Sequence, residues 1–180
     1  MKNMIFIGGI HGVGKTTFCN MIFDKYRLVS YSASRLISDA KKQEFGPSKR
    51  ISNVDTNQDL LVDALEGIRF GDQCFLLDGH FCLIDKAGRI IRIPEKTFQQ
   101  LAPKAIIVLT NAIESIQGRL LGRDNWDYAE EFLEKFQDEE LLYAEEVSKM
   151  LRVPYLECRF DRAELKPVEM FLMSLGAISK

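Results

Sequence analysis

The sequence predicts a three-layer α/β domain, in which helices cover both faces of a parallel sheet. Short continuous apolar runs, typical of strands buried on both faces, alternate along the chain with longer segments of helical periodicity. The first run is followed at once by a glycine-rich loop and a helix, an order that suits phosphate binding. Because 180 residues suit one domain and no repeat interrupts them, we expect residues 1–180 to form a single unit.

The first strand and the first helix enclose the most informative motif. Met4–Ile7 is the apolar run, Thr17–Tyr26 has helical periodicity, and Gly9–Thr17 between them fits the pattern G-x-x-x-x-G-K-[ST]. This is the P-loop pattern in the context of strand and helix that it requires. Thr17 stands where a dinucleotide-binding fingerprint needs a third glycine, which excludes that alternative.

The residue types of this motif suit the phosphates of a nucleotide. Glycines allow backbone N–H groups to approach phosphate oxygens, and the start of the following helix adds its positive end. We expect the Lys15 side chain to face solvent and to bind the β- and γ-phosphates, and the Thr16 hydroxyl to ligate Mg²⁺. The expected cofactors are therefore ATP and Mg²⁺. The residues expected to bind the nucleotide are Gly9, His11, Gly12, Val13, Gly14, Lys15, Thr16 and Thr17.

The remaining strands are recognised by their apolar runs. They are expected at Leu28–Val29, Cys74–Leu77, Ala105–Leu109 and Tyr155–Cys158. Between the third and fourth strands, Phe81–Ile84 and Arg89–Ile93 flank a short polar segment, which predicts a β-hairpin with Gly88 in its turn. We expect this hairpin, over about residues 81–93, to be an insertion in the alternating pattern.

The remaining helices are recognised by periodicity and by end signals. Ser32 or Ser34 can cap a helix that ends near Ala40. The other helices are expected to begin at Pro94 and Pro167 and to span about residues 58–70, 113–121 and 128–151. Residues 41–57 are polar and contain a Gly-Pro pair, so we expect a mobile connection there.

The charge balance narrows the classes of function. The 24 Lys and Arg residues against 26 Asp and Glu residues give a formal net charge of −2, whereas nucleic-acid coats and membrane-surface binders need a basic excess. Ten of the acids fall within residues 124–146 beside one base, which predicts a solvated acidic face on an amphipathic helix. The sequence shows no membrane-length apolar run, signal peptide or zinc-spaced cysteines. We expect a cytoplasmic protein without membrane or nucleic-acid partners.

Two further polar residues follow the third strand. Asp78 ends that strand, where ligands bind in open α/β sheets, and a carboxylate there suits Mg²⁺ held directly or through water. The alternative is a turn residue, because Asp-Gly pairs are common in turns. His80 stands two residues later, and its ring makes either ordinary loop hydrogen bonds or a contact with a phosphoryl acceptor.

Two arginines after the fourth strand suit a transferring phosphoryl group. Arg119 and Arg123 are four residues apart, so they share one helix face while the helix continues. Arginines that converge from a mobile loop neutralise charge on such a group, which predicts a lid over about residues 119–128. The alternative is a pair of solvated helix arginines.

These segments resemble the adenylate-kinase-like branch of the P-loop nucleoside monophosphate kinases. The resemblance rests on the Gly9–Thr17 loop, the Ser-rich segment with Arg35, the sequence Leu77–His80 and the arginine pair, and the hairpin is especially similar to that of archaeal-type adenylate kinases. It implies a P-loop NTPase fold with a five-stranded parallel sheet and flanking helices. It also implies transfer of the ATP γ-phosphoryl group, with Mg²⁺, to a nucleoside monophosphate or similar small phosphate acceptor. The implied roles are ATP and metal binding for Lys15, Thr16 and Asp78, acceptor phosphate binding for Arg35, and closure over the transferred group for Arg119 and Arg123.

The family pattern is not matched everywhere. Many adenylate kinases continue the third-strand motif with an arginine that holds the acceptor phosphate, whereas His80 and Phe81 follow the Asp-Gly pair here. A phosphotransferase is the favoured interpretation, and an ATPase whose hydrolysis drives a protein partner interaction is the alternative. A third, a GTP-dependent switch, needs an Asn-Lys-x-Asp loop after the fourth strand, where the chain has Thr110–Ile113.

Overall fold

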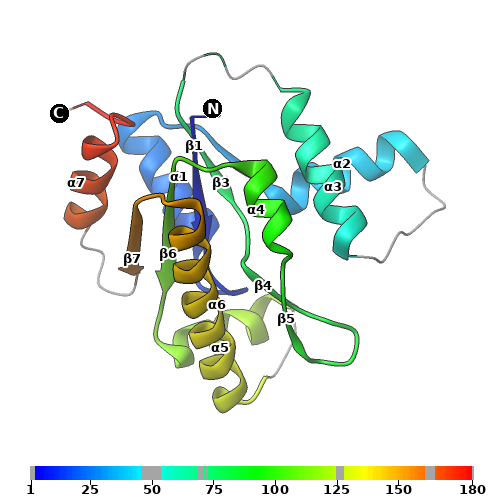
Figure 1. Ribbon diagram of the computed structural model, residues 1–180. Helices are drawn as coiled ribbons and strands as arrows, with labels where there is room; N and C mark the ends of the chain where they lie inside the picture. Colours follow the sequence, from blue (N-terminus) through cyan, green and yellow to red (C-terminus); the bar gives the residue numbers. More distant parts are fainter. Residues whose placement is uncertain are drawn as a thin grey trace.

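The computed structural model describes residues 3–45, 54–68, 71, 73–124, 128–160 and 165–179, without the side chains of residues 43–45, 54–56, 123 and 124. At its centre is a five-stranded sheet in the order β2-β3-β1-β6-β7, and every neighbouring pair is parallel (Figure 1). The strands are β1 (Met4–Gly8), β2 (Ser30–Ser32), β3 (Phe75–Asp78), β6 (Ala105–Thr110) and β7 (Tyr155–Arg159). The predicted five-stranded parallel sheet is confirmed.

The apolar sequences of the central strands reflect burial on both faces. β1 lies between β3 and β6, with Phe6 opposite Leu77 on one side and Ile106 on the other. All residues of β1 and β6 are buried. The ring of Phe6 lies 5.0 Å from that of Phe81 and 5.6 Å from that of Phe98, so the core continues from the sheet into the covering layer.

Helices cover both faces of the sheet, as predicted. One face carries α1 (Lys15–Tyr26) and α7 (Lys166–Ser174), which the Lys25–Glu169 ion pair joins (Figure 1). The other face carries α4 and α6, α5 follows the carboxyl end of β6, and α2 and α3 pack against each other on the side of β2 (Figure 1). These helices are α2 (Ala33–Phe45), α3 (Val54–Glu66), α4 (Glu95–Leu101), α5 (Ile113–Asp124) and α6 (Glu130–Leu151).

A hairpin follows the third strand of the chain, as the sequence predicts. Its strands, β4 (Cys82–Ile84) and β5 (Ile90–Arg92), pair antiparallel. The Asp85 carboxylate accepts the backbone N–H groups of Ala87 and Arg89, and Gly88 has a φ of 77°. This side chain and this glycine close the turn.

Some predicted boundaries are wrong. β2 begins two residues later than expected, because its pairing with β3 starts at Ser30; the apolar Leu28 before it is buried in the core and is 5% exposed. α2 and α3 extend into the connection expected over 41–57, because they pack against each other. α5 continues past Leu121 through Gly122 to Asp124, since one glycine costs a helix interior only about 1 kcal/mol.

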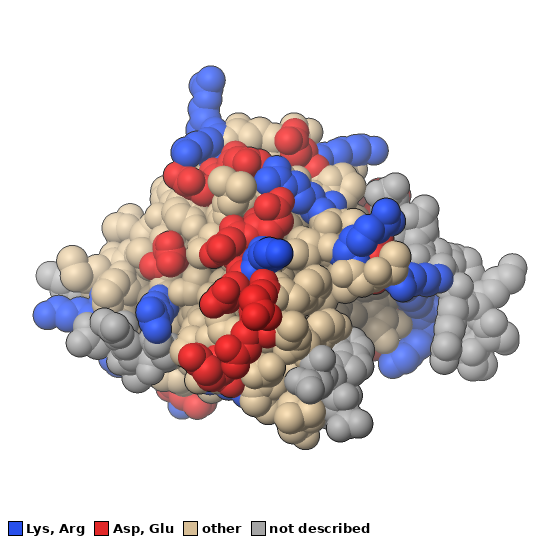
Figure 2. Space-filling model, turned by 90° about the horizontal axis from the view of Figure 1, so that it is seen from below, with Lys and Arg blue, Asp and Glu red and all other residues tan. Residues whose placement is uncertain are grey.

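The long helix α6 carries its acids mostly on the solvent side. Phe136, Tyr143 and Val147 are buried, as predicted, and Figure 2 shows acidic side chains gathered in a band across the face seen from below. Glu140, in contrast, is 1% exposed. The predicted solvated face is wrong there, because Glu140 follows Phe136 by four residues and precedes Tyr143 by three, which places it on the apolar face.

The structure also bears on membranes and on cysteine chemistry. None of the helices in the described ranges has the length and apolar content that crossing a membrane requires.

The four cysteines are free thiols, two of them buried, and burial raises the pKa of Cys19 to about 12. A thiol with such a pKa stays protonated at neutral pH.

Candidate functional site

The loop between β1 and α1 has the backbone shape that phosphate binding needs. Gly9, Gly12 and Gly14 have φ values of 140°, 81° and 114°, a region that residues with side chains rarely adopt. A Cβ at Gly14 would lie 2.9 Å from the ring of Phe160, and a Cβ at Gly9 would lie 2.9 Å from the carbonyl oxygen of Leu109. Gly14 is the N-cap of α1 and no side chain caps that end, so backbone N–H groups of the first turn can bind an anion.

Side chains from three other segments hold the loop backbone in this shape. Glu140 of α6 accepts the N–H of Gly9 at 2.8 Å. Asn111, after β6, donates to the carbonyl oxygen of Val13 at 3.1 Å, and Arg119 of α5 donates to the same oxygen at 2.9 Å. The rest of the fold therefore preorganises the loop.

Glu140 is the candidate positioning residue that the sequence interpretation missed. Its carboxylate also accepts the N–H groups of Phe81 at 2.9 Å and Cys82 at 2.6 Å, so it joins the P-loop to the chain after β3. Burial raises the pKa of this carboxyl, and the Lys15 charge and the backbone N–H donors oppose the rise. The signal that could have found it is its helical spacing from Phe136 and Tyr143 on an apolar face.

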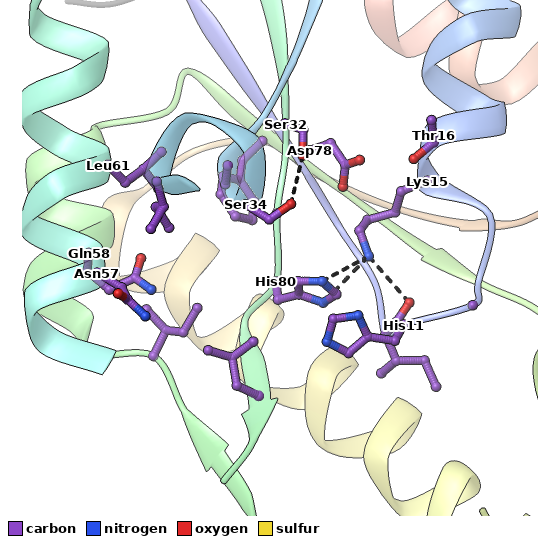
Figure 3. A pocket seen from close by; sticks show the side chains of 18 of the residues that line it. His11, Lys15, Thr16, Ser32, Ser34, Asn57, Gln58, Leu61, Asp78 and His80 are labelled. Carbon is purple, nitrogen blue, oxygen red and sulfur yellow. Dashed lines mark hydrogen bonds between the residues drawn. The ribbon is translucent and has the colours of Figure 1, made fainter. Parts of the chain in front are cut away.

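Lys15 is held inside the loop and not in solvent. The residue is 8% exposed, and its ammonium donates to the carbonyl oxygens of Gly9 at 2.6 Å and Ile10 at 3.3 Å. Its Nζ also lies 3.5 Å from both ring nitrogens of His80 (Figure 3). The expectation of a solvent-facing side chain is wrong, because the loop carbonyls that the glycines expose turn toward the ammonium and accept its hydrogen bonds.

Thr16 and Asp78 come together beside Lys15 (Figure 3). Burial raises the pKa of Asp78 above its usual value, and the charge of Lys15 and a hydrogen bond from Thr16 oppose this rise only in part. Hydroxyl and carboxylate oxygens are hard donors that suit Mg²⁺, which commonly takes one or two protein ligands and fills its other positions with phosphate oxygens and water. The residues present therefore fit a Mg²⁺ ion held together with a nucleotide. In the described ranges, no group of three or more His, Cys, Asp or Glu side chains forms a metal site by itself.

The two histidines lie against each other at the same place. The ring centroids of His11 and His80 are 4.2 Å apart. Burial, and then the charges of Lys15 and His11, lower the pKa of His80 well below its usual range. His80 is therefore neutral at physiological pH, and it lies beside the Lys15 ammonium in the lining of the same cavity (Figure 3).

Of the two arginines in the predicted lid, the structure describes the side chain of Arg119. Arg119 donates to the carbonyl oxygens of Gly12 at 3.0 Å and Val13 at 2.9 Å, so it reaches the P-loop from α5. The Arg123 side chain and residues 125–127 lie outside the described residues. The lid expected over about 119–128 is thus described at residues 119–124 and at Tyr128, and its closure stays a prediction.

A cavity of about 960 Å³ extends from the P-loop toward α2, α3 and α4. The predicted residues that line it are His11, Gly12, Gly14, Lys15, Thr16, Thr17, Asp78, His80 and Arg119. Gly9 and Val13 are buried and belong to the loop backbone without lining the cavity. Arg35 is exposed on α2 and does not line it either, so its contact with an acceptor phosphate stays a prediction. The sequence interpretation did not assign Ser32, Ser34, Asn57 and Gln58 to the site, although all four line the cavity; Ser32 lies beside Asp78 in the sheet, and Asn57 and Gln58 lie on the side away from Thr16 (Figure 3).

Asp78 offers a direct test of the metal site. We expect Asp78→Asn to raise the Mg²⁺ concentration needed for half-maximal ATP turnover by about 10- to 100-fold, because a carboxamide binds the metal more weakly than a carboxylate. Binding of ATP without metal should change less. Turnover during a Mg²⁺ titration measures the first effect, and ATP binding in EDTA measures the second. The matched control is Asp138→Asn, because Asp138 is exposed. An unchanged titration would assign Asp78 to the turn alone.

The sheet is parallel, the glycine-rich loop follows its first strand, and an acidic residue ends the neighbouring strand. These features define a P-loop protein of the kinase fold. The chain belongs to the AAA domain family, which matches residues 8–137. No curated protein matches the sequence.

Two solved structures share the fold. One is a shikimate kinase from Acinetobacter baumannii in complex with shikimate, with a TM-score of 0.57, 14% identity, and coverage of 100% of this chain and 97% of that chain. The other is a gluconokinase from Sinorhizobium meliloti 1021, with a TM-score of 0.52, 14% identity, and coverage of 96% of this chain and 91% of that chain. At this identity the similarity establishes the fold, and the expected likeness to archaeal-type adenylate kinases stays a prediction.

Proposed function

We propose that the protein is a kinase that transfers the γ-phosphoryl group of Mg-ATP to a small molecule. The observation that carries this proposal is the cavity of about 960 Å³, which holds the P-loop at one end and continues to a second, differently lined end. A kinase needs both ends in one enclosed space, because the acceptor must meet the γ-phosphate in line and away from water. An ATPase that drives a protein partner needs only the first.

The residues at the P-loop end have complementary roles in this proposal. The N–H groups at the start of α1 bind the phosphates, and the Lys15 ammonium exchanges its loop carbonyls for β- and γ-phosphate oxygens. Thr16 and Asp78 are the residues that would hold Mg²⁺, and the ion would supply positive charge that neutralises the phosphates of the nucleotide. Arg119 reaches the same end from α5 and adds positive charge beside the transferred group.

Two further observations support a small-molecule acceptor. His80 and Lys15 stand at the junction between the two ends of the cavity, where a reacting oxygen would meet the γ-phosphate (Figure 3). Shikimate kinase, whose fold this chain shares, has been solved with the small molecule shikimate bound. Neither observation depends on the adenylate-kinase resemblance, which proposes a nucleoside monophosphate in the same position.

The test is whether ATP turnover depends on an acceptor. Purified protein is given γ-labelled Mg-ATP alone and then with a fractionated small-molecule extract, and free phosphate is separated from labelled organic phosphate. We expect turnover to rise at least about tenfold with an active fraction, and the label to appear in an organic product, because positioned reactants outcompete water. Turnover at an unchanged rate, with all label in free phosphate, would favour the partner-driven ATPase.

A further inference from the structure

The end of the cavity away from the P-loop has apolar walls. They come from α2, α3, α4 and the hairpin, through Ile37, Leu61, Leu83, Ile93, Phe98 and Leu101. Leu61, Ile93, Phe98 and Leu101 are 5% exposed or less and belong to the packed core, and the half-buried Ile37 and Leu83 pack against it. A rigid apolar site of this kind favours a ligand with a ring or another compact apolar body.

The charges of the cavity are gathered at its other end. Among the described lining residues, the side chains of Lys, Arg, Asp and Glu are Lys15, Asp78 and Arg119, and all three belong to the P-loop end. The polar groups elsewhere are neutral hydroxyls and carboxamides, such as Ser34 and Gln58. A phosphate dianion placed against these walls would lose its water without gaining a cation from the described lining residues, which is strongly unfavourable.

Two carboxamides provide hydrogen bonds at the apolar end. Asn57 and Gln58, from α3, lie on the opposite side of the cavity from Thr16 (Figure 3). Gln58 is 7% exposed, and the Asn57 Oδ1 atom is buried with no hydrogen-bond partner among the described residues. A buried acceptor atom without a donor is costly, so a ligand that supplies an N–H group gains affinity there. Carboxamides are suited to the donor and acceptor edges of nucleobases.

We infer that the acceptor is an uncharged nucleoside, with its base between the apolar walls and an N–H group of the base donating to Asn57 Oδ1. This inference rests on the proposed kinase function. The sugar hydroxyl then points toward Lys15 and the γ-phosphate. Its oxygen forms a bond to the γ-phosphorus while the bond from that phosphorus to the β,γ-bridging oxygen breaks. The electron pair of the broken bond leaves with ADP, and the hydroxyl proton is released to water, so the products are a nucleoside monophosphate and ADP.

Matched pairs of ligands test the charge of the acceptor. Adenosine, guanosine, cytidine and uridine, and their 5′-monophosphates, are titrated by calorimetry into protein saturated with Mg²⁺ and a non-hydrolysable ATP analogue. We expect at least one nucleoside to bind about tenfold or more tightly than its own monophosphate, because the monophosphate carries an unpaired charge into the apolar end. With γ-labelled ATP, the label should appear in a nucleoside monophosphate.

Variants of the two carboxamides test the position of the base. Asn57→Leu and Gln58→Leu should each weaken nucleoside binding by about tenfold, because each removes a buried polar partner. Binding of the ATP analogue alone should stay unchanged. Gln100→Leu, at an exposed glutamine of α4 outside the cavity, is the matched control. Asn57→Ser, which is smaller and polar, gives a second variant if the leucine disturbs folding, and it should also weaken binding.

The outcomes separate this inference from the proposed function. Tighter binding of a monophosphate, or label in a nucleoside diphosphate, would overturn the neutral acceptor and leave the kinase proposal standing. Binding of no nucleoside, or full nucleoside binding by the carboxamide variants, would also overturn it. The kinase proposal itself fails only if no fraction of the small-molecule extract takes up label.

Discussion

Lys15→Ala is expected to lower phosphoryl transfer by about 10³-fold or more, because the ammonium is the positive side chain built into the P-loop. The loss should appear in kcat, since this charge is needed most where the transferred group develops negative charge. The side chain also donates to Gly9 and Ile10, so ATP affinity should fall as the loop loosens. Initial rates over a range of ATP concentrations separate the two effects.

The matched control for this variant is Lys25→Ala. Lys25 lies on the same helix, is exposed, and pairs with Glu169 of α7 far from the cavity. Because exposed ion pairs contribute little, its replacement should leave both the stability and the rate nearly unaltered. Near-normal turnover by Lys15→Ala, with the fold verified by circular dichroism, would remove the P-loop from the proposed chemistry.

Glu140→Leu is expected to reduce the free energy of unfolding by about 3 kcal/mol or more. The carboxylate accepts the N–H groups of Gly9, Phe81 and Cys82, and a leucine leaves all three donors buried without a partner. Glu140→Gln should cost less, because its remaining side-chain oxygen still accepts a hydrogen bond. Urea denaturation of the purified variants measures these differences.

Activity provides a second readout for Glu140. Because Gly9 begins the P-loop, a loosened backbone there should weaken ATP binding even at temperatures where the variant is folded. Glu134→Leu, an exposed acid on the same helix, is the control and should change stability by no more than about 0.5 kcal/mol. Equal stability of the Glu134 and Glu140 variants would show that the buried carboxylate does not support the loop.

The parts of the fold that depend on local chemistry follow from the sequence. The run Met4–Ile7 is apolar because β1 is buried on both faces, and the turn of the hairpin needs Gly88 at positive φ. The glycines of Gly9–Thr17 are required by φ values and close contacts that no other residue tolerates. Such constraints act between residues that are close in the chain, so they can be predicted from the sequence.

Helix ends were less predictable, for a physical reason. Where a connection is expected over 41–57, α2 continues to Phe45 and α3 begins at Val54, and the two helices pack against each other; residues 46–53 lie outside the described residues. α5 passes through Gly122, because the low helix propensity of one glycine costs only about 1 kcal/mol. Such local preferences are easily outweighed, since most of the stability of a helix in a protein comes from the packing of its apolar face.

The sequence by itself determined the phosphate-binding loop, the alternating α/β order and the position of Asp78 at a strand end. Only the tertiary structure decided that Glu140, from the acidic helix, is buried beneath the P-loop, and that Asn57 and Gln58 face Lys15 across one cavity. The features that the sequence determined depend on backbone geometry and on the burial pattern of residues that are neighbours in the chain. Those that only the tertiary structure decided depend on groups more than 40 positions apart in the chain, whose meeting is set by how the layers pack.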